Sequence, residues 1–304
     1  MSKSVLMTGG AGSMGKLAVK SLLELGFSVR VFDLPGLDYT ELAGLAGVTI
    51  FEGDITQPDS VRPAVDGVTA VVHLAALLPP VSEKDRDFTF AVNVDGCKTV
   101  ADAVAEEAKG AALILSSSVS TYGDTMTGDS PAGGSRPAER LVTIDQTQSP
   151  IDIYGESKVA AETACRNIYP DTTILRISGV SVPAFSEPPD VWPFMEDQRI
   201  EFIHRDDAVT AMCTAVTSTA ARGRIYNISG GKSWRMTGKK YVKDYFDLLG
   251  VPIEEAQFQS QPGWCDWYET EESEKDLAYQ NTGYAAYLGQ IEKEVQALLA
   301  EYDD

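Results

Sequence analysis

The chain has 304 residues, 43% of them hydrophobic, and a formal net charge of −20. A chain of this length can bury a large core, so we expect one large domain or one domain with a smaller lobe. The acidic excess repels phosphate backbones and anionic membranes, which argues against nucleic-acid and membrane partners.

The first residues enter a short apolar run that leads at once into glycines, unlike a signal or transit peptide. No apolar run approaches the ~20 residues that span a bilayer. We therefore expect a soluble, cytoplasmic protein. The widely spaced Cys97, Cys165 and Cys213 lie in alanine-rich, helix-like segments and are predicted to be buried thiols. With two histidines and no C-x-x-C pair, we expect no metal site.

Short β-branched runs alternate with longer helical patterns over the first two-thirds of the chain. The runs are nearly all apolar, as expected for strands that helices cover on both faces. The predicted strands are residues 4–7, 28–32, 49–51, 70–73, 112–115 and 173–177, and the predicted helices are residues 13–25, 87–108 and 152–169. This alternation predicts an α/β fold with a Rossmann-type doubly wound parallel sheet.

The pattern changes beyond Gly179. Residues 182–197 predict an irregular loop, and a helix is expected after Asp207. The later predicted elements are a strand at 224–228, a helix at 237–250 and a helical tail after Lys275. We expect a small mixed C-terminal substrate lobe here. Residues 125–137 are rich in Gly, Pro and Ser and predict a mobile surface loop.

A glycine-rich loop lies between the first predicted strand and the first predicted helix. Gly9, Gly12 and Gly15 allow a tight turn, close approach of the backbone to a pyrophosphate and close helix–strand packing. The loop includes Ser13 and Met14 and leads into a helix N-terminus, where free N–H groups favour phosphates. The sequence therefore predicts a dinucleotide site.

Asp33 closes the second predicted strand, 18 residues after Gly15. A carboxylate there accepts the ribose hydroxyls of an adenosine and repels a 2′-phosphate, so we expect NAD rather than NADP. A turn-forming aspartate is the alternative interpretation. We expect the NAD-binding domain to span 1–178 plus about 203–229, and the substrate lobe about 179–202 plus 230–304.

Tyr154 and Lys158 are four residues apart and share one face of the predicted helix 152–169. A nearby cation stabilises a phenolate and lowers the phenol pKa from ~10, so the pair can exchange a proton with an alcohol or carbonyl. Such a pair also occurs on ordinary solvated helices. Its functional interpretation therefore depends on the serines that end at Ser118 and on the glycine loop.

Several motifs in this order resemble the extended short-chain dehydrogenase/reductase family, also called the NAD-dependent epimerase/dehydratase family. The resemblance covers about the first 230 residues. The motifs are Thr8-Gly-Gly-Ala-Gly-Ser-Met-Gly15, Gly53-Asp54-Ile55, His73-Leu74-Ala75-Ala76, Asn93-Val94-Asp95-Gly96, Ser116-Ser-Ser-Val-Ser-Thr-Tyr-Gly123, Tyr154-x-x-x-Lys158 and Phe202-Ile-His-Arg-Asp-Asp207.

The resemblance implies roles along the cofactor. Asp54 and Ile55 would contact the adenine ring. Residues lining the path of the pyrophosphate and ribose would be Leu74, Ala75 and Ala76, with Asn93 nearby.

It also implies the catalytic residues. Ser118 matches the catalytic serine, Tyr154 would donate and accept the proton, and Lys158 would bind the nicotinamide ribose and lower the Tyr154 pKa. Ser116 and Ile177 would lie near the cofactor. Hydride would pass between the cofactor and a substrate carbon.

Departures from the family pattern bear on the substrate. Ser118 is followed by Val119 and Ser120 rather than by the acidic pair of the 4,6-dehydratases. Gly179 and Val180 stand near the place where epimerases usually carry Asn and Gly-Pro. These departures disfavour a dehydratase and indicate a smaller substrate: a free sugar, a sugar acid or another secondary alcohol.

Two groups of side chains have open interpretations. Arg176, Arg199 and Arg235 either supply a cation for an acidic substrate or form salt bridges. The tryptophans either wall the pocket or pack the lobe; they are Trp192, Trp234, Trp264 and Trp267.

We therefore expect an NAD-dependent oxidoreductase that acts on a secondary alcohol or ketone of a carbohydrate-like or other small substrate. A second hypothesis is an epimerase of sugars or nucleotide sugars, similar to UDP-glucose 4-epimerase, with retained NAD. A third is a non-catalytic NAD-sensing or scaffold protein. The resemblance also implies a homodimer through the helices 87–108 and 152–169.

Overall fold

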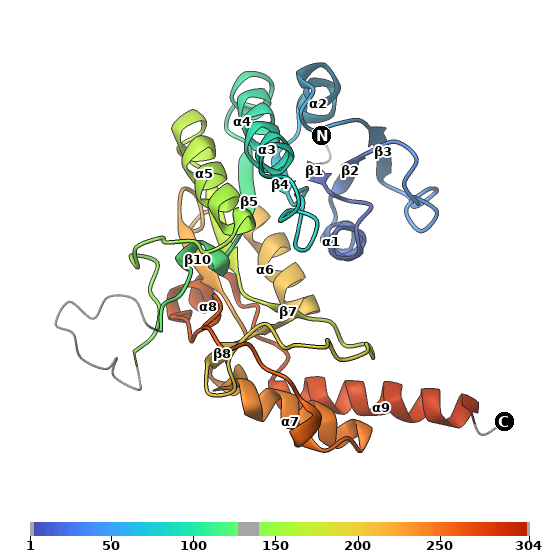
Figure 1. Cartoon of the computed structure of the whole chain (residues 1–304). Coiled ribbons are helices and arrows are strands. Elements are labelled where there is room, and N and C mark those ends of the chain that lie inside the picture. The colour runs from blue at the N-terminus through green and yellow to red at the C-terminus, as the bar shows by residue number, and fades with distance from the viewer. Residues whose placement is uncertain (1–2, 127–139, 303–304) are drawn as a thin grey trace.

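The computed structural model describes residues 3–126 and 140–302. Its centre is a sheet of parallel strands in the order β10-β6-β5-β4-β1-β2-β3 (Figure 1). The strands are β1 (Ser4–Thr8), β2 (Ser28–Asp33), β3 (Val48–Glu52), β4 (Ala70–His73), β5 (Ala112–Ser118), β6 (Thr173–Ile177) and β10 (Ile225–Ile228). This sheet confirms the predicted Rossmann-type α/β class. Most of the predicted loop 125–137 lies outside the described residues.

Helices cover both faces of the sheet and bury an apolar cluster on each. One face packs against α1 (Ser13–Glu24) and α6 (Arg205–Thr217). The other packs against α2 (Pro58–Val65), α4 (Gly96–Glu107) and α5 (Ile153–Ile168). Because the strands are covered on both faces, their side chains are apolar without alternation.

The strand order reverses between β1 and β4, which are hydrogen-bonded neighbours. Thr8 and His73 end these two strands side by side, and the Thr8 Oγ1 and His73 Nδ1 atoms are 2.8 Å apart. Connections from the two strands leave toward opposite faces at such a point and open a crevice at the carboxyl ends. The glycine loop and residues 74–76 both begin at this crevice.

Some predicted boundaries were wrong. The helix expected at 87–108 is divided into α3 (Arg86–Phe90), the π-helical segment η1 (Ala91–Asp95) and α4. The sequence prediction missed α2, which has Pro58 in its first turn and Pro63 in its interior, where a proline argues against a helix. The tail expected to be helical after Lys275 is interrupted between α8 (Glu271–Leu277) and α9 (Tyr284–Tyr302).

The later residues build a further apolar cluster around α7 (Gly238–Leu249) and α9. In Figure 1 these two helices lie together at the bottom, away from the strands of the sheet. Two small pairings accompany them: β8 (Arg199–Glu201) with β11 (Arg235–Thr237), and β7 (Val180–Ser181) with β9 (Ile203–His204). Short 3₁₀ segments are η2 (Val119–Tyr122), η3 (Lys232–Trp234) and η4 (Ile253–Glu255). The proposed division into an NAD-binding domain and a substrate lobe stays a prediction.

The cysteines at 97, 165, 213 and 265 are free and buried. In the described parts of the chain, no helix has the length and apolar character needed to cross a membrane. The homodimer through α4 and α5 stays a prediction.

Candidate active site

A cavity of about 940 Å³ opens at the carboxyl ends of the strands. It brings together residues from the glycine loop, from the ends of several strands and from α5. Of the predicted site residues, Gly9, Gly12, Ser13, Met14, Gly15, Asp33, Asp54, Ile55, Leu74, Ala75, Ala76, Ser116, Ser118, Tyr154, Lys158 and Ile177 line it. Asn93 is not among the residues that line the cavity, and its predicted place near the cofactor stays a prediction.

The glycine loop depends on the small size of its residues. Gly9 has a φ of +70°, in the left-handed region, and a Cβ there would lie 2.8 Å from the backbone nitrogen of Ala75. A Cβ on Gly15 would lie 2.2 Å from the carbonyl oxygen of Gly9. The start of α1 is therefore pressed against the turn after β1, as the predicted helix–strand packing requires.

Asp33 at the end of β2 serves the loop as well as the cavity. Its Oδ2 accepts from the Ala11 N–H at 3.0 Å, and its Oδ1 accepts from the Leu34 N–H at 2.9 Å. Both the turn interpretation and a place on the cavity wall therefore hold. After the neighbouring strand β3, the Asp54 carboxylate accepts from the Thr56 N–H at 2.8 Å, which fixes the segment that carries Ile55.

We expect Asp33→Asn to lower the preference for NAD over NADP at least about tenfold, which corresponds to ~1.4 kcal/mol. The amide keeps an acceptor for the Ala11 N–H but removes the charge that repels a 2′-phosphate. Fluorescence titration with each cofactor measures the two dissociation constants. An unchanged ratio of these constants would count against the assigned role of Asp33.

The three predicted catalytic residues meet at the end of β5. Ser118, the last residue of β5, is aligned with Ile177 of β6. The Ser118 hydroxyl acts on the Tyr154 phenol so as to lower its pKa, and it accepts from the Ser120 N–H at 3.1 Å. Lys158 Nζ lies 5.5 Å from the centre of the Tyr154 ring and donates to the Ser116 carbonyl oxygen at 2.9 Å.

The start of α5 is held by carboxylates that the sequence prediction did not identify. Asp152 accepts from the Gly155 N–H at 2.6 Å as the N-cap. Glu83 accepts from the N–H groups of Ile153 and Tyr154, each at 3.0 Å. Negative charge at a helix N-terminus is stabilising, so both groups fix the first turn, which carries Tyr154.

The Asn93 side chain connects neighbouring segments behind the cavity. Its side chain is buried, donates to the Ser157 hydroxyl at 2.9 Å and bonds the backbone of Leu77 in both directions. The Ser157 hydroxyl in turn donates to the Tyr154 carbonyl oxygen at 2.7 Å. Asn93 therefore joins η1, α5 and the segment after β4, one layer behind the cavity wall.

The expected lowering of the Tyr154 pKa by Lys158 was wrong for this structure. Burial raises the pKa of the Tyr154 phenol, and the hydrogen bond from Ser118 opposes this only in part. Burial also lowers the pKa of Lys158 to about 8, because the ammonium loses hydration.

The three arginines form ion pairs. Arg176 Nη2 lies 2.7 Å from the Glu162 carboxylate, Arg199 pairs with Asp266 at 2.6 Å, and Arg235 Nε lies 2.8 Å from Glu201. None of the three lines the cavity in the described parts of the chain. The structure thus favours the salt-bridge interpretation over binding of an acidic substrate.

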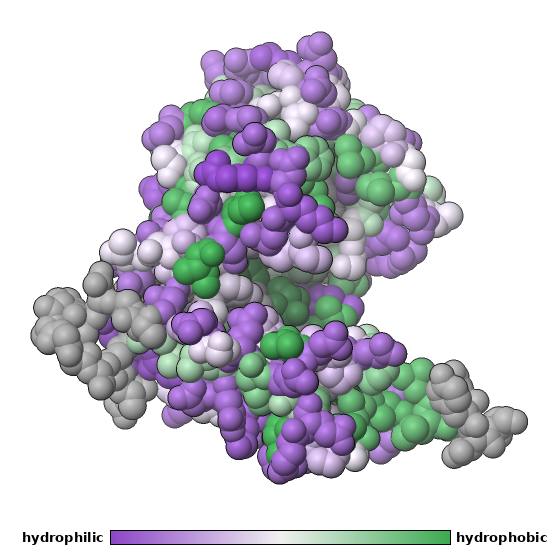
Figure 2. Space-filling view, viewed as in Figure 1, coloured by the Kyte–Doolittle hydropathy of each residue, from purple (hydrophilic) through white to green (hydrophobic). Residues whose placement is uncertain are grey.

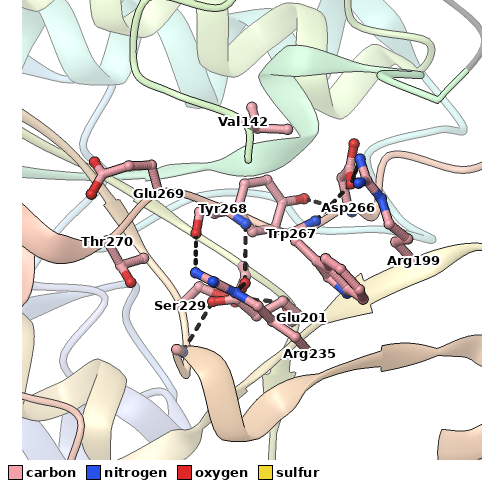
Figure 3. A network of polar contacts seen from close by, with 12 residues as sticks. Val142, Arg199, Glu201, Ser229, Arg235, Asp266, Trp267, Tyr268, Glu269 and Thr270 are labelled. Atoms are coloured by element: carbon pink, nitrogen blue, oxygen red, sulfur yellow. Dashed lines mark hydrogen bonds and ion pairs between the residues drawn. The ribbon is translucent and has the colours of Figure 1, made fainter. Parts of the chain in front are cut away.

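Two of these pairs fasten the segment 264–270 to β8 and β11. Figure 3 shows Glu201 between Arg235 and the backbone of Tyr268, and Asp266 beside Arg199. The Tyr268 N–H donates to Glu201 Oε2 at 3.0 Å, and Arg235 Nη2 donates to the Tyr268 carbonyl oxygen at 2.6 Å. This buried network holds in place the segment whose first residue is Trp264.

Trp264 is the one tryptophan of the described residues that lines the large cavity. The buried Gln198 side chain clamps both of its neighbours, bonding the Gly263 N–H and carbonyl and the Cys265 carbonyl at 2.9–3.0 Å. The sequence gave no signal for this clamp, since its partners are more than 60 residues apart. Trp192 and Trp234 belong to the apolar cluster of the lobe, as the packing interpretation expected.

The chain is similar in sequence to several dehydrogenases. The 3 beta-hydroxysteroid dehydrogenase/Delta 5→4-isomerase of Mycobacterium tuberculosis is 35% identical over 164 residues, which cover 52% of this chain and 40% of that protein. The D-erythronate dehydrogenase of Cupriavidus necator is 31% identical over 192 residues, which cover 59% of this chain and 56% of that protein. The matches thus span only about half or less of these relatives' lengths.

Among solved structures, a short-chain dehydrogenase/reductase superfamily protein from Agrobacterium tumefaciens with bound NAD shares the fold. Its TM-score is 0.77 at 22% identity, with 99% of each chain covered. Residues 5–186 match the model of the NAD dependent epimerase/dehydratase family, more than half of the chain. The chain therefore belongs to the NAD-dependent epimerase/dehydratase family, and NAD is the cofactor that this membership gives it.

Proposed function

We propose that the protein is an NAD-dependent oxidoreductase that interconverts a secondary alcohol and a ketone on a sugar-like or other small molecule. The observation that carries the proposal is that Ser118, Tyr154 and Lys158 line the same cavity as the glycine loop. Two relatives whose names describe dehydrogenases support it.

The residues present fit NAD. The cavity runs from the turn at Gly9 past Asp33 and Asp54 to Lys158, and its phosphate end lies at the N-terminus of α1. Asp33 would accept from the adenosine ribose, and Lys158 would donate to the nicotinamide ribose. When bound, NAD supplies the hydride acceptor.

The chain's own residues handle the proton. Ser118 would hold the substrate oxygen beside Tyr154, since both side chains line the same cavity. In alcohol oxidation, the phenolate of Tyr154 would take the hydroxyl proton while the carbon loses its hydride to the nicotinamide. Lys158, close to the Tyr154 ring, would stabilise the phenolate.

Absorbance at the NADH wavelength tests the proposal in a screen of aldoses, sugar acids, sugar nucleotides and simple secondary alcohols with NAD. Steady net formation of NADH supports a dehydrogenase. Conversion of a sugar without net NADH, with cofactor that stays bound through purification, would support the epimerase alternative. NAD binding without turnover of any class would support the NAD-sensing alternative.

We expect kcat/KM for alcohol oxidation to rise with pH through about 8, and kcat/KM for ketone reduction to fall. The Lys158 pKa of about 8 lies below its usual value, so the Tyr154–Lys158 pair loses its first proton as the pH rises through this value. The pair with one proton fewer is the form able to accept the proton of an alcohol. Initial rates between pH 6 and 10 measure both profiles.

Lys158→Met serves as the control for this pH dependence. Without the ammonium, the rise of kcat/KM for alcohol oxidation near pH 8 should disappear, because the Tyr154 phenol alone has a raised pKa. A wild-type oxidation rate that stays flat between pH 7 and 9 would contradict the assignment of this titration to the pair.

A further inference from the structure

A second cavity of about 390 Å³ adjoins the cofactor cavity. Gly179, Val180 and Trp264 lie on the walls of both, so the two spaces meet. Gly179 follows β6, whose last residue, Ile177, is aligned with Ser118. The second cavity therefore begins near the reacting end of the first. Figure 2 shows a hollow between the upper and lower parts of the molecule with hydrophobic residues at its floor.

Several aromatic side chains line the second cavity. They include Phe185, Trp192, Phe202, Tyr241 and Trp264. The rings pack against one another, with the centres of Phe202 and Tyr241 5.1 Å apart and those of Trp192 and Tyr241 6.1 Å apart. Such rigid aromatic walls favour a flat apolar group over a strongly hydrated one.

Apart from Glu187, the described polar side chains of this cavity are neutral. Burial raises the pKa of the Tyr241 and Tyr287 phenols, which therefore stay protonated. The buried indole N–H of Trp192 has no hydrogen-bond partner among the described residues. The hydrogen-bonding side chains of the cavity other than Glu187 are therefore uncharged.

Charge on the walls disfavours an anion. In the described part of the chain, the second cavity is lined by Glu187 and by no lysine or arginine, and Lys158 is the one cation of the first cavity. The arginines of the lobe are held in their ion pairs. A carboxylate or phosphate on the substrate would lose its hydration without finding a cation beyond the cofactor.

The rim of the two cavities is apolar as well. Leu78 and Phe88 line the first cavity and are 57% and 55% exposed, and Val182 lines the second and is 44% exposed. Large apolar side chains gathered in the open around a cavity mark a binding surface for an apolar ligand.

We propose that the second cavity holds the part of the substrate remote from the reacting carbon, and that the substrate is an uncharged secondary alcohol or ketone with an apolar ring. The inference rests on the proposed function, since the alcohol carbon must react in the first cavity. It excludes sugar acids and nucleotide sugars as preferred substrates.

A matched pair of probes tests the charge preference: 1-phenylethanol and 4-(1-hydroxyethyl)benzoate, which differ by one carboxylate. We expect the wild-type kcat/KM for the neutral probe to exceed that for the carboxylate at least about tenfold, equivalent to ~1.4 kcal/mol. Ala184 lines the second cavity and is exposed, so its side chain can be changed without disturbing the core. Ala184→Arg should raise KM for 1-phenylethanol and lower it for the carboxylate. Ala285→Arg, at an exposed position of α9 that lines neither cavity, should leave both unchanged.

Isothermal titration calorimetry of the NAD-loaded protein with the same two probes separates this inference from the proposed function. If neither probe is oxidised but the neutral one binds more tightly and Ala184→Arg reverses the order, the second cavity is confirmed and the dehydrogenase proposal fails. If both are oxidised and the carboxylate is preferred, the dehydrogenase proposal holds and the inference is overturned. Equal binding of both probes, unaffected by Ala184→Arg, also overturns it.

Discussion

Tyr154→Phe is expected to lower kcat by about 10²- to 10⁴-fold, the usual contribution of a positioned acid or base, while NAD binds as before. The substitution removes one oxygen atom from a ring that stays between Ser118 and Lys158. The cofactor contacts assigned to the glycine loop and Asp33 are untouched. Stopped-flow or steady-state NADH formation measures the loss, and a fluorescence titration with NAD measures the affinity.

Tyr169→Phe is the matched control, since it removes a phenol oxygen just beyond the other end of α5. The Tyr169 hydroxyl donates to the Ala111 carbonyl oxygen, which also accepts from Arg222 at 2.7 Å and so keeps a partner. This variant should keep wild-type kcat. Activity of Tyr154→Phe near the wild-type level would refute the role of the phenol.

Gly15→Ala is expected to weaken NAD binding at least about tenfold and to lower the free energy of unfolding by about 1–3 kcal/mol. The new Cβ would lie 2.2 Å from the Gly9 carbonyl oxygen and 2.7 Å from the Gly10 Cα. Both contacts are with backbone atoms, which cannot rotate away as a side chain can. The steric clash is therefore removed only if α1 moves away from the turn that would face the pyrophosphate. Urea unfolding and NAD titration measure the two effects.

Gly289→Ala controls for the loss of a glycine in a helix. A Cβ at this position in α9 meets nothing within 4 Å. We therefore expect unchanged NAD affinity and a gain of roughly 0.5–1 kcal/mol in stability. Wild-type NAD affinity in Gly15→Ala would show that the predicted close packing does not shape the cofactor site.

The sheet could be predicted because each strand is a short apolar run with a strong local signal. β5 is longer than predicted, since its last residues are the serines 116–118, which carry no apolar signal. The glycine loop and the Tyr154–Lys158 pair could be found because one turn of chain brings their members together. In both cases the spacing along the chain already fixes the geometry.

Contacts between distant segments could not be predicted in this way. Glu83 caps the helix of Tyr154 from 71 residues away, and Gln198 reaches a segment 65 residues further on. Nor did composition reveal that the arginines considered for substrate binding are already paired with buried carboxylates. The direction of the Tyr154 pKa was missed for a similar reason: burial depends on the whole fold, whereas spacing suggests only a neighbour.

The clamp around Trp264 has an evolutionary consequence. The family match ends at residue 186, yet Gln198 and Trp264 lie beyond it and shape the wall shared by the two cavities. Mutations after residue 186 can therefore reshape the substrate wall while leaving the glycine loop and Asp33 intact. Proteins that descend from one ancestor can thus keep the same cofactor-binding residues and differ in substrate specificity through changes after residue 186 alone.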